Sequence, residues 1–246
     1  MKEIPVSAII PAFNEEKTVA KTVRVALNAF PNGQVIVVDN ASGDRTSEFA
    51  RRTGAEVVAA PIMGKGRAMT AGLCQARGKV IVFFDADVTN AGQLMLKKLA
   101  RPVMDGKCDL TIGSFSIEGP QLFTELAYRP FVRLFFPEVD CVIPLNPLSG
   151  QRAMLRSAAE ALVFEPGFGV ETGMNVDVVM KGLKVRQAGL GRLEPVHKGT
   201  LDPQVLSSRA SEITATVLRK AKQYGRHSLS MHALETVFNG VKRSLH

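Results

Sequence analysis

The chain has 246 residues, of which 46% are hydrophobic and 22% are charged. Such a chain can bury a large core as one α/β domain, and the lack of any run of 18 apolar residues excludes a membrane span. The N-terminus enters a strand pattern directly, so we expect no signal peptide. Three cysteines without metal-ligand spacing, Cys74, Cys108 and Cys141, indicate a reduced, cytoplasmic protein.

The net charge of +8 is concentrated at the C-terminal end of the sequence. Residues 197–246 hold eight Lys or Arg against three Asp or Glu and so contribute +5 of it. A basic tail can face solvent, or it can contact phosphates, nucleic acid or an anionic membrane surface. Because the chain has no Trp and only two Tyr, no aromatic platform for single-stranded nucleic acid is apparent, and we expect no nucleic-acid partner.

Residues 1–90 alternate between strand and helix patterns with short connections. We expect strands at residues 6–10, 35–38, 56–59 and 80–84, with helices beginning at Asn14, at about Asp44 and at about residue 67. This alternation predicts a doubly wound, mostly parallel central sheet flanked by helices.

The rest of the chain is less regular. A helix is predicted over 91–104 and a strand over 109–112. Later helices are expected at 121–136 with an interruption near Pro130, at 152–162 and at 171–182, followed by a strand at 184–188. From 203 to 244 the pattern is helical, with a break near Gly225, which predicts a helical C-terminal extension.

Asp85-Ala86-Asp87 follows the most strongly apolar strand, Val80 to Phe84. Ligands of open α/β sheets bind outside the carboxyl ends of the strands. Carboxylates there suit Mg²⁺ or Mn²⁺, which complete their coordination with phosphate oxygens and water. The alternative is an ordinary turn, since Asp is common at strand ends.

Other polar residues could serve a nucleotide site. Asp39 also follows a strand and can accept a hydrogen bond from a base or a ribose, or simply cap the turn. Lys65, between two glycines, could approach a diphosphate, but no P-loop spacing and no G-x-G-x-x-G occurs. His197 could complete the coordination of a metal ion with Asp87, or it could be an ordinary surface residue. Glu171 could face a sugar or the acceptor hydroxyl, or it could stand at a helix start because the helix dipole favours an acidic residue there.

Taken together, the motifs IIPAFNEE, VIVVDNASGDRT, GKGRAM and FFDAD resemble nucleotide-sugar glycosyltransferases of family 2, which have the Rossmann-like GT-A fold. The later motifs TELAYRPFVRLFFPE, PLSGQRA, GFGVETGMNVDV and GLGR, followed by His197, resemble the glucosyl-3-phosphoglycerate synthases and their mannosyl relatives, which are retaining enzymes. The resemblance implies one GT-A domain over 1–246, with a nucleotide-sugar-binding part (1–114), an acceptor-side part (115–225) and a basic helical tail (226–246).

The resemblance also implies a UDP-sugar donor, glucose being the expected sugar, and a Mg²⁺ or Mn²⁺ ion held by Asp87 and His197. Catalytic roles fall on Asp85, Asp87 and Glu171. The nucleotide-sugar would contact Pro11, Ala12, Phe13, Glu15, Asp39, Lys65, Asp85, Ala86 and Leu148, with Asp39 reading the uracil. The acceptor would contact Thr124, Ser149, Gly150 and Glu171.

The acceptor half departs from the synthases. Where they have a Gly-Arg-x-Thr run, this chain has Gln121-Leu122-Phe123-Thr124, so Leu122 replaces the basic residue expected to grip an acceptor phosphate. Gly199 replaces the polar residue expected two positions after the histidine. The acceptor is therefore left open between a small molecule and a lipid carrier, as are a homodimer and a peripheral membrane contact through the basic tail.

Three alternatives stand beside a retaining synthase-like enzyme. An inverting family 2 transferase could act on a polyprenyl phosphate, with a carboxylate near Glu171 as general base. A nucleotidyltransferase would also use a Lys and a metal-binding Asp, but PAFNEE stands where its Gly-rich, Arg-bearing loop belongs. A binding module that has kept only the fold would not need Lys65, Asp85, Asp87 and His197 together.

Overall fold

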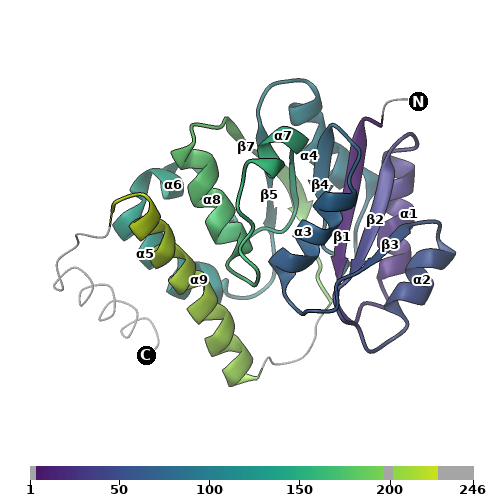
Figure 1. Ribbon diagram of the computed structural model, residues 1–246, viewed down its shortest axis with the longest axis horizontal. Helices are drawn as coiled ribbons and strands as arrows, with labels where there is room; N and C mark the ends of the chain where they lie inside the picture. The colour runs from purple at the N-terminus through teal and green to yellow at the C-terminus, as the bar shows by residue number, and fades with distance from the viewer. Residues whose placement is uncertain (1–3, 197–201, 227–246) are drawn as a thin grey trace.

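The apolar runs of the sequence form one seven-stranded sheet in the computed structural model, which describes residues 4–196 and 202–226 (Figure 1). The strand order is β3-β2-β1-β4-β6-β5-β7. The strands are β1 (Val6–Ala12), β2 (Gln34–Asp39), β3 (Glu56–Ala59), β4 (Val80–Phe83), β5 (Leu110–Ser116), β6 (Arg152–Leu155) and β7 (Val185–Arg192). Every neighbouring pair is parallel except those that involve β6, which confirms a mostly parallel sheet.

Strand β6 is the element that the sequence misassigned. The expectation of a helix over 152–162 is wrong at its start, because Arg152–Leu155 pairs antiparallel with β4 and with β5, and only α7 (Arg156–Glu160) is helical. Neither partner strand is adjacent in sequence, so tertiary pairing overrides the local helical preference.

Side chains alternate between two cores along each central strand. In β1, Ala8 and Ile10 belong to one core and Ile9 to the other. The first core is covered by helices α1 (Val19–Ala29), α2 (Thr46–Arg52) and α4 (Gln93–Met104). The second is covered by α3 (Lys65–Gln75), by α7, and by helices from the second half of the chain.

These later helices all follow β5 in the sequence. They are the π-helix η1 (Phe123–Tyr128), α5 (Arg129–Phe135), α6 (Pro137–Val142), α8 (Val170–Met180) and α9 (Pro203–Gln223). The predicted interruption near Pro130 is the junction of η1 and α5. Helix α9 packs against η1, α5 and α8, which confirms a C-terminal helix (Figure 1). No helix in the described ranges is both long and apolar enough to cross a membrane.

The first loop also differs from its prediction. Helix α1 begins at Val19 rather than just after Asn14, whose backbone has φ +54°. The Asn14 side chain instead accepts a hydrogen bond from the Gly43 N–H at 2.9 Å, so it joins the β1 loop to the β2 loop. Strand β1 itself continues to Ala12, because its last residues, Pro11 among them, still pair with β2 beyond the end of β4.

Candidate active site

A cavity of about 280 Å³ opens at the carboxyl ends of β1 and β4. It brings together most of the residues expected to hold the nucleotide-sugar, although they come from segments far apart in the sequence. Its walls are formed by Pro11, Ala12, Phe13, Glu15, Asn40, Met63, Gly64, Lys65, Asp85, Ala86, Asp87, Phe168 and Arg209. This is the edge of an α/β sheet where ligands bind.

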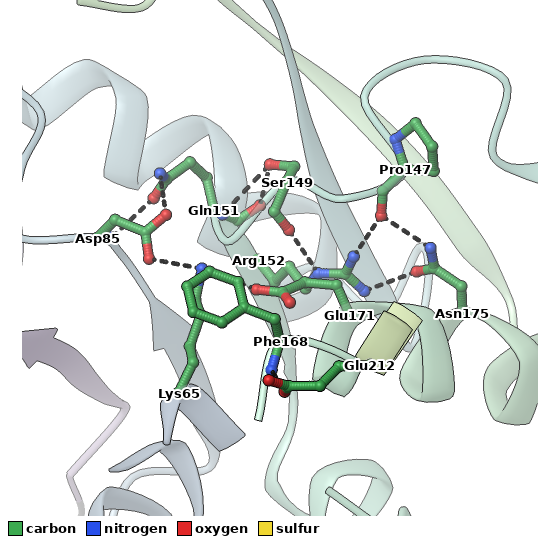
Figure 2. Close-up of polar contacts among 10 residues, drawn as sticks. All are labelled: Lys65, Asp85, Pro147, Ser149, Gln151, Arg152, Phe168, Glu171, Asn175 and Glu212. Atoms are coloured by element: carbon green, nitrogen blue, oxygen red, sulfur yellow. Dashed lines mark hydrogen bonds and ion pairs between the residues drawn. The ribbon is translucent and has the colours of Figure 1, made fainter. Parts of the chain in front are cut away.

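Asp85 is fixed from both sides by polar contacts (Figure 2). Gln151 accepts from the Asp85 backbone N–H and donates to its carboxylate, each at 2.9 Å. The Lys65 ammonium lies 3.1 Å from the other carboxylate oxygen. A carboxylate held by two partners keeps one orientation, as a preorganised site requires.

Lys65 also forms an ion pair of 2.8 Å with Glu171, a buried residue in the first turn of α8. Burial by itself would lower the pKa of the ammonium, but the carboxylates of Asp85 and Glu171 outweigh it, so the net shift of the Lys65 pKa is upward. Lys65 therefore stays charged and joins the end of β4 to helix α8.

Gly150 is required where these side chains meet. A Cβ at this position would lie 2.3 Å from an Asp85 carboxylate oxygen and 2.7 Å from the Lys65 nitrogen, closer than real contacts allow. Gly150 therefore lies against the ion pair. Its neighbour Ser149 is buried and exchanges hydrogen bonds with the backbone of Gln151.

The loop that carries Ser149 and Gly150 is braced from beneath by Arg152, whose side chain is fully buried. Its guanidinium donates to the carbonyls of Ser149 and Pro147 and to the Asn175 side chain at 2.7–2.8 Å (Figure 2). Asn175 donates in turn to Tyr128 and Pro147. Burial lowers the pKa of Arg152, while Glu171, Tyr128 and Asp85 act in the opposite direction. Gln151 and Asn175 were not predicted as site residues from the sequence. Their only signal was that they lie within the motifs PLSGQRA and GFGVETGMNVDV.

Asp39 and Asn40, at the end of β2, differ in whether their side chains reach the cavity. Both Asp39 carboxylate oxygens accept hydrogen bonds, one from the Ser42 N–H at 3.0 Å in the following loop and one from the Ser47 hydroxyl in the first turn of α2, and Asp39 does not line the cavity. Asn40 does line it and is 6% exposed, and among the residues that the structure describes no donor reaches its Oδ1. A buried acceptor without a partner needs an explanation, and a ligand N–H supplies one.

Asp87 lines the cavity from the loop after β4. The segment before residue 197 runs antiparallel beside this loop: Val88 pairs with Pro195, and Val196 donates to the Asp87 carbonyl at 2.8 Å. The predicted ligand His197 lies outside the described residues. Within the described residues no group of three His, Cys, Asp or Glu could hold a metal. Asp87 supplies a hard carboxylate oxygen at the cavity, and such an oxygen fits a Mg²⁺ or Mn²⁺ ion whose remaining ligands come from phosphates and water.

Thr124, predicted to contact the acceptor, and Leu148, predicted to contact the nucleotide-sugar, do not line this cavity. Thr124 is buried in η1, and Leu148 packs partly buried against the core. Leu122, in contrast, is 49% exposed.

A mostly parallel sheet with paired carboxylates at the end of a central strand, facing a cavity beside the β1 loop, defines a nucleotide-sugar glycosyltransferase of the GT-A fold. The glycosyl transferase family 2 model matches residues 7–155, and the chain belongs to that family. This confirms the fold, the family and the enzyme class expected from the sequence.

Two relatives show how far the similarity extends. The chain is 31% identical over 239 residues to the glucosyl-3-phosphoglycerate synthase of Mycobacterium tuberculosis, which covers 84% of this chain and 72% of that protein. It is 27% identical over 259 residues to the Petrotoga mobilis enzyme of the same name, with coverages of 93% and 77%.

Solved structures of the M. tuberculosis enzyme agree in fold. A complex with Mn²⁺, UDP-glucose and phosphoglyceric acid has a TM-score of 0.78 at 29% identity, covering 89% of this chain and 80% of that chain. A complex with Mg²⁺ and UDP has a TM-score of 0.77 at 31% identity, covering 88% and 79%.

Proposed function

We propose that this protein transfers glucose from UDP-glucose to an acceptor hydroxyl, with Mg²⁺ or Mn²⁺ and with retention of anomeric configuration. The observation that carries the proposal is the cavity at the ends of β1 and β4, lined by Asp85 and Asp87 and by the β1 loop. The related synthase binds UDP-glucose and Mn²⁺ or Mg²⁺, which supports the same donor and metal here.

Asp87 and His197 would hold the metal ion, which when bound neutralises charge on the leaving diphosphate as a Lewis acid. The hydrogen bond between Val196 and the Asp87 carbonyl supports this pairing, because it fixes the residue preceding His197 beside Asp87. Asp85, held by Lys65 and Gln151, would orient the ribose or the sugar.

Retention is supported by the state of Glu171. Its buried carboxylate is already ion-paired with Lys65, so the ammonium occupies the oxygen that a general base would present to the acceptor hydroxyl. The acceptor oxygen would then form its bond to the anomeric carbon on the face that the diphosphate leaves, and its proton would pass to the departing phosphate oxygen. Glu171 would orient the reacting groups.

The test is a donor screen followed by product analysis. UDP with Mn²⁺ should raise the unfolding temperature, since a ligand at a hundred times its dissociation constant stabilises a protein by about 2.7 kcal/mol. NMR of the product of UDP-glucose turnover should show an α-linked glucose. A β-linked product would replace this proposal with the inverting alternative, and no response to any nucleoside diphosphate would refute the donor assignment.

We propose that Asn40, rather than Asp39, reads the uracil. Its buried Oδ1 would accept from N3–H of uracil, a donor that cytosine lacks. Replacing Asn40 with alanine should lower UDP affinity about three- to tenfold, the usual range for one net hydrogen bond, and should leave CDP affinity nearly unchanged. Isothermal titration with UDP and CDP measures both, and equal affinity of the wild type for the two would contradict this role.

The acceptor site supports an acceptor less anionic, or larger, than 3-phosphoglycerate. Three arginines could have compensated for Leu122, and each is already engaged. Arg129 binds Glu125, Asp140 and the Pro144 carbonyl; Arg133 binds Asp140. Arg152 is buried against backbone carbonyls. An anionic ligand normally needs such donors, and each of these three already has a carboxylate or carbonyl partner, although Arg133 is 61% exposed and bound only through Nε.

Installing the missing cation should therefore change acceptor preference. The Leu122→Arg variant is expected to gain at least about tenfold in kcat/KM for 3-phosphoglycerate relative to glycerate, because one charged hydrogen bond contributes about 1.5–3 kcal/mol. Leu122→Gln is the matched neutral control and should gain little. UDP release measured with 3-phosphoglycerate, glycerate and a polyprenyl phosphate gives the comparison. Efficient use of 3-phosphoglycerate by the wild type would show that Leu122 does not alter the acceptor.

A further inference from the structure

Arg209 is a cation of the donor cavity that the sequence did not single out. It lies on α9, and its guanidinium stacks on the Phe168 ring at 4.0 Å from the centroid. It lines the cavity together with Lys65, Asp85 and Asp87, and also an adjoining hollow with Phe13, Glu15 and Val196. Arg209 therefore lies between the β1 loop and the end of β4, on the nucleotide side of the site.

The Arg209 side chain is held in position by contacts between one face of α9 and the Phe168 loop. One turn further along α9, Glu212 accepts a hydrogen bond from the Phe168 N–H at 2.7 Å (Figure 2). One further turn along, Thr216 lies so close to Gly169 that a Cβ there would be 2.1 Å from its hydroxyl. One face of α9, formed by residues 209, 212 and 216, therefore packs on the loop that carries Phe168. This packing holds the Phe168 ring in place beneath the Arg209 guanidinium.

Arg209 and Lys65 differ in how far neighbouring carboxylates compensate their positive charges. Lys65, the residue expected to meet the diphosphate, lies between the carboxylates of Asp85 and Glu171, which compensate its charge. Arg209 forms no ion pair with any carboxylate of the described ranges. Burial lowers its pKa, and the charge of Glu212 opposes this. A partly buried guanidinium that faces a cavity without a paired carboxylate favours an anionic ligand, and its planar fork of donors suits phosphate oxygens.

We propose that Arg209 binds the diphosphate of the sugar-nucleotide donor, the role that the sequence assigned to Lys65. This inference rests on the proposed function, which makes the ligand a UDP-sugar. The guanidinium would donate to phosphate oxygens whose negative charge grows as the glycosidic bond breaks, and so would stabilise UDP as the leaving group. Phe168 and Glu212 are positioning residues that hold Arg209 toward the cavity.

The experiment separates the diphosphate from the nucleoside. UDP and uridine are titrated, with Mn²⁺ present throughout, into the wild type and into Arg209→Gln and Arg209→Lys variants. Arg209→Gln should lose about ten- to a hundredfold in UDP affinity and keep its affinity for uridine, because only the charged hydrogen bonds are removed. Arg209→Lys should show a smaller loss, because it keeps the charge without the fork. Lys222→Gln, which removes an exposed charge from the same helix, should match the wild type.

Separate results test whether UDP is the donor nucleotide and whether Arg209 binds its diphosphate. If the wild type fails to bind UDP, the proposed donor is wrong. If the wild type binds UDP and Arg209→Gln binds it equally well, or loses uridine affinity to the same extent, Arg209 does not bind the diphosphate. An unchanged UDP affinity with a raised KM for the acceptor would move Arg209 to the acceptor side and overturn the proposal. Ligand-free unfolding temperatures of both variants, expected to match the wild type, show that the helix is intact.

Discussion

Replacing Asp87 with asparagine is expected to lower glucose transfer by about a hundredfold or more, while the ligand-free unfolding temperature stays within a few degrees. The expected loss follows from the several kcal/mol that a metal contributes to charge stabilisation in the transition state, each 1.36 kcal/mol being a factor of ten in rate. Stability should persist because the Asp87 side chain lines a cavity rather than the core. UDP release from UDP-glucose in Mn²⁺ measures the rate.

Two controls make the result specific to the metal site. Asp105→Asn removes a carboxylate that pairs with Lys107 just after α4, and it should leave transfer unchanged. EDTA should abolish wild-type activity, and added Mn²⁺ or Mg²⁺ should restore it. An Asp87→Asn enzyme that retains full activity, or a wild type that is insensitive to EDTA, would remove the metal from the mechanism.

The first half of the fold was predictable because its signals are local. Strands β1 to β4 are short apolar runs separated by helices with polar ends, and parallel order follows from that alternation. The same locality identified Asp85 and Asp87, since a carboxylate directly after a buried strand must lie at the edge of the sheet. In the structure these two residues line one cavity with residues of the β1 loop.

The second half was less predictable because its structure depends on distant partners. Strand β6 is four residues long and is specified by strands on both sides, neither adjacent in sequence. Gln151 reaches Asp85 across 66 positions, and Arg152 reaches Asn175 across 23. No periodicity within a window of sequence encodes such pairs.

The base-binding end shows a finer limit of sequence reasoning. Asp39 and Asn40 are neighbours, and which of them faces the cavity is decided by the loop that follows β2. Ala41 has φ +62° there, and the Asp39 carboxylate accepts hydrogen bonds from the Ser42 N–H and from the Ser47 hydroxyl at the start of α2. A motif locates the loop, but the backbone conformation decides which side chain faces a ligand.

The residues that fasten α9 to the rest of the enzyme give the largest expected effect on stability. Lys220 on α9 and Asp177 on α8 form an ion pair of 2.6 Å, and each side chain is 1% exposed. Tyr224 donates to the second Asp177 oxygen at 3.0 Å; burial, and then the charge of Asp177, raise the pKa of Tyr224 to about 12. The Glu165 carboxylate lies 3.9 Å from the Lys220 nitrogen, so the loop before α8 joins the same cluster.

Replacing Lys220 with methionine should destabilise the protein by about 3–5 kcal/mol, because it leaves the Asp177 carboxylate buried without its cation. For a chain of this size that corresponds to a fall of about 6–20 °C in unfolding temperature. The double variant Asp177→Asn, Lys220→Met should recover much of the loss, because neither buried charge then remains uncompensated. Arg219→Ala, which breaks the half-exposed pair with Glu165 one residue away, should cost no more than about 1 kcal/mol.

Urea unfolding of the four proteins measures these differences, and donor binding links them to function. Because α9 presents Arg209 and Glu212 to the Phe168 loop, Lys220→Met should also weaken UDP binding, and the double variant should restore it. If Lys220→Met is no less stable than Arg219→Ala, the buried pair does not fasten α9. If Lys220→Met unfolds at a lower urea concentration but binds UDP as tightly as the wild type, the Lys220–Asp177 pair does not control UDP affinity. The anchoring of α9, which carries Arg209, would then not determine the donor site.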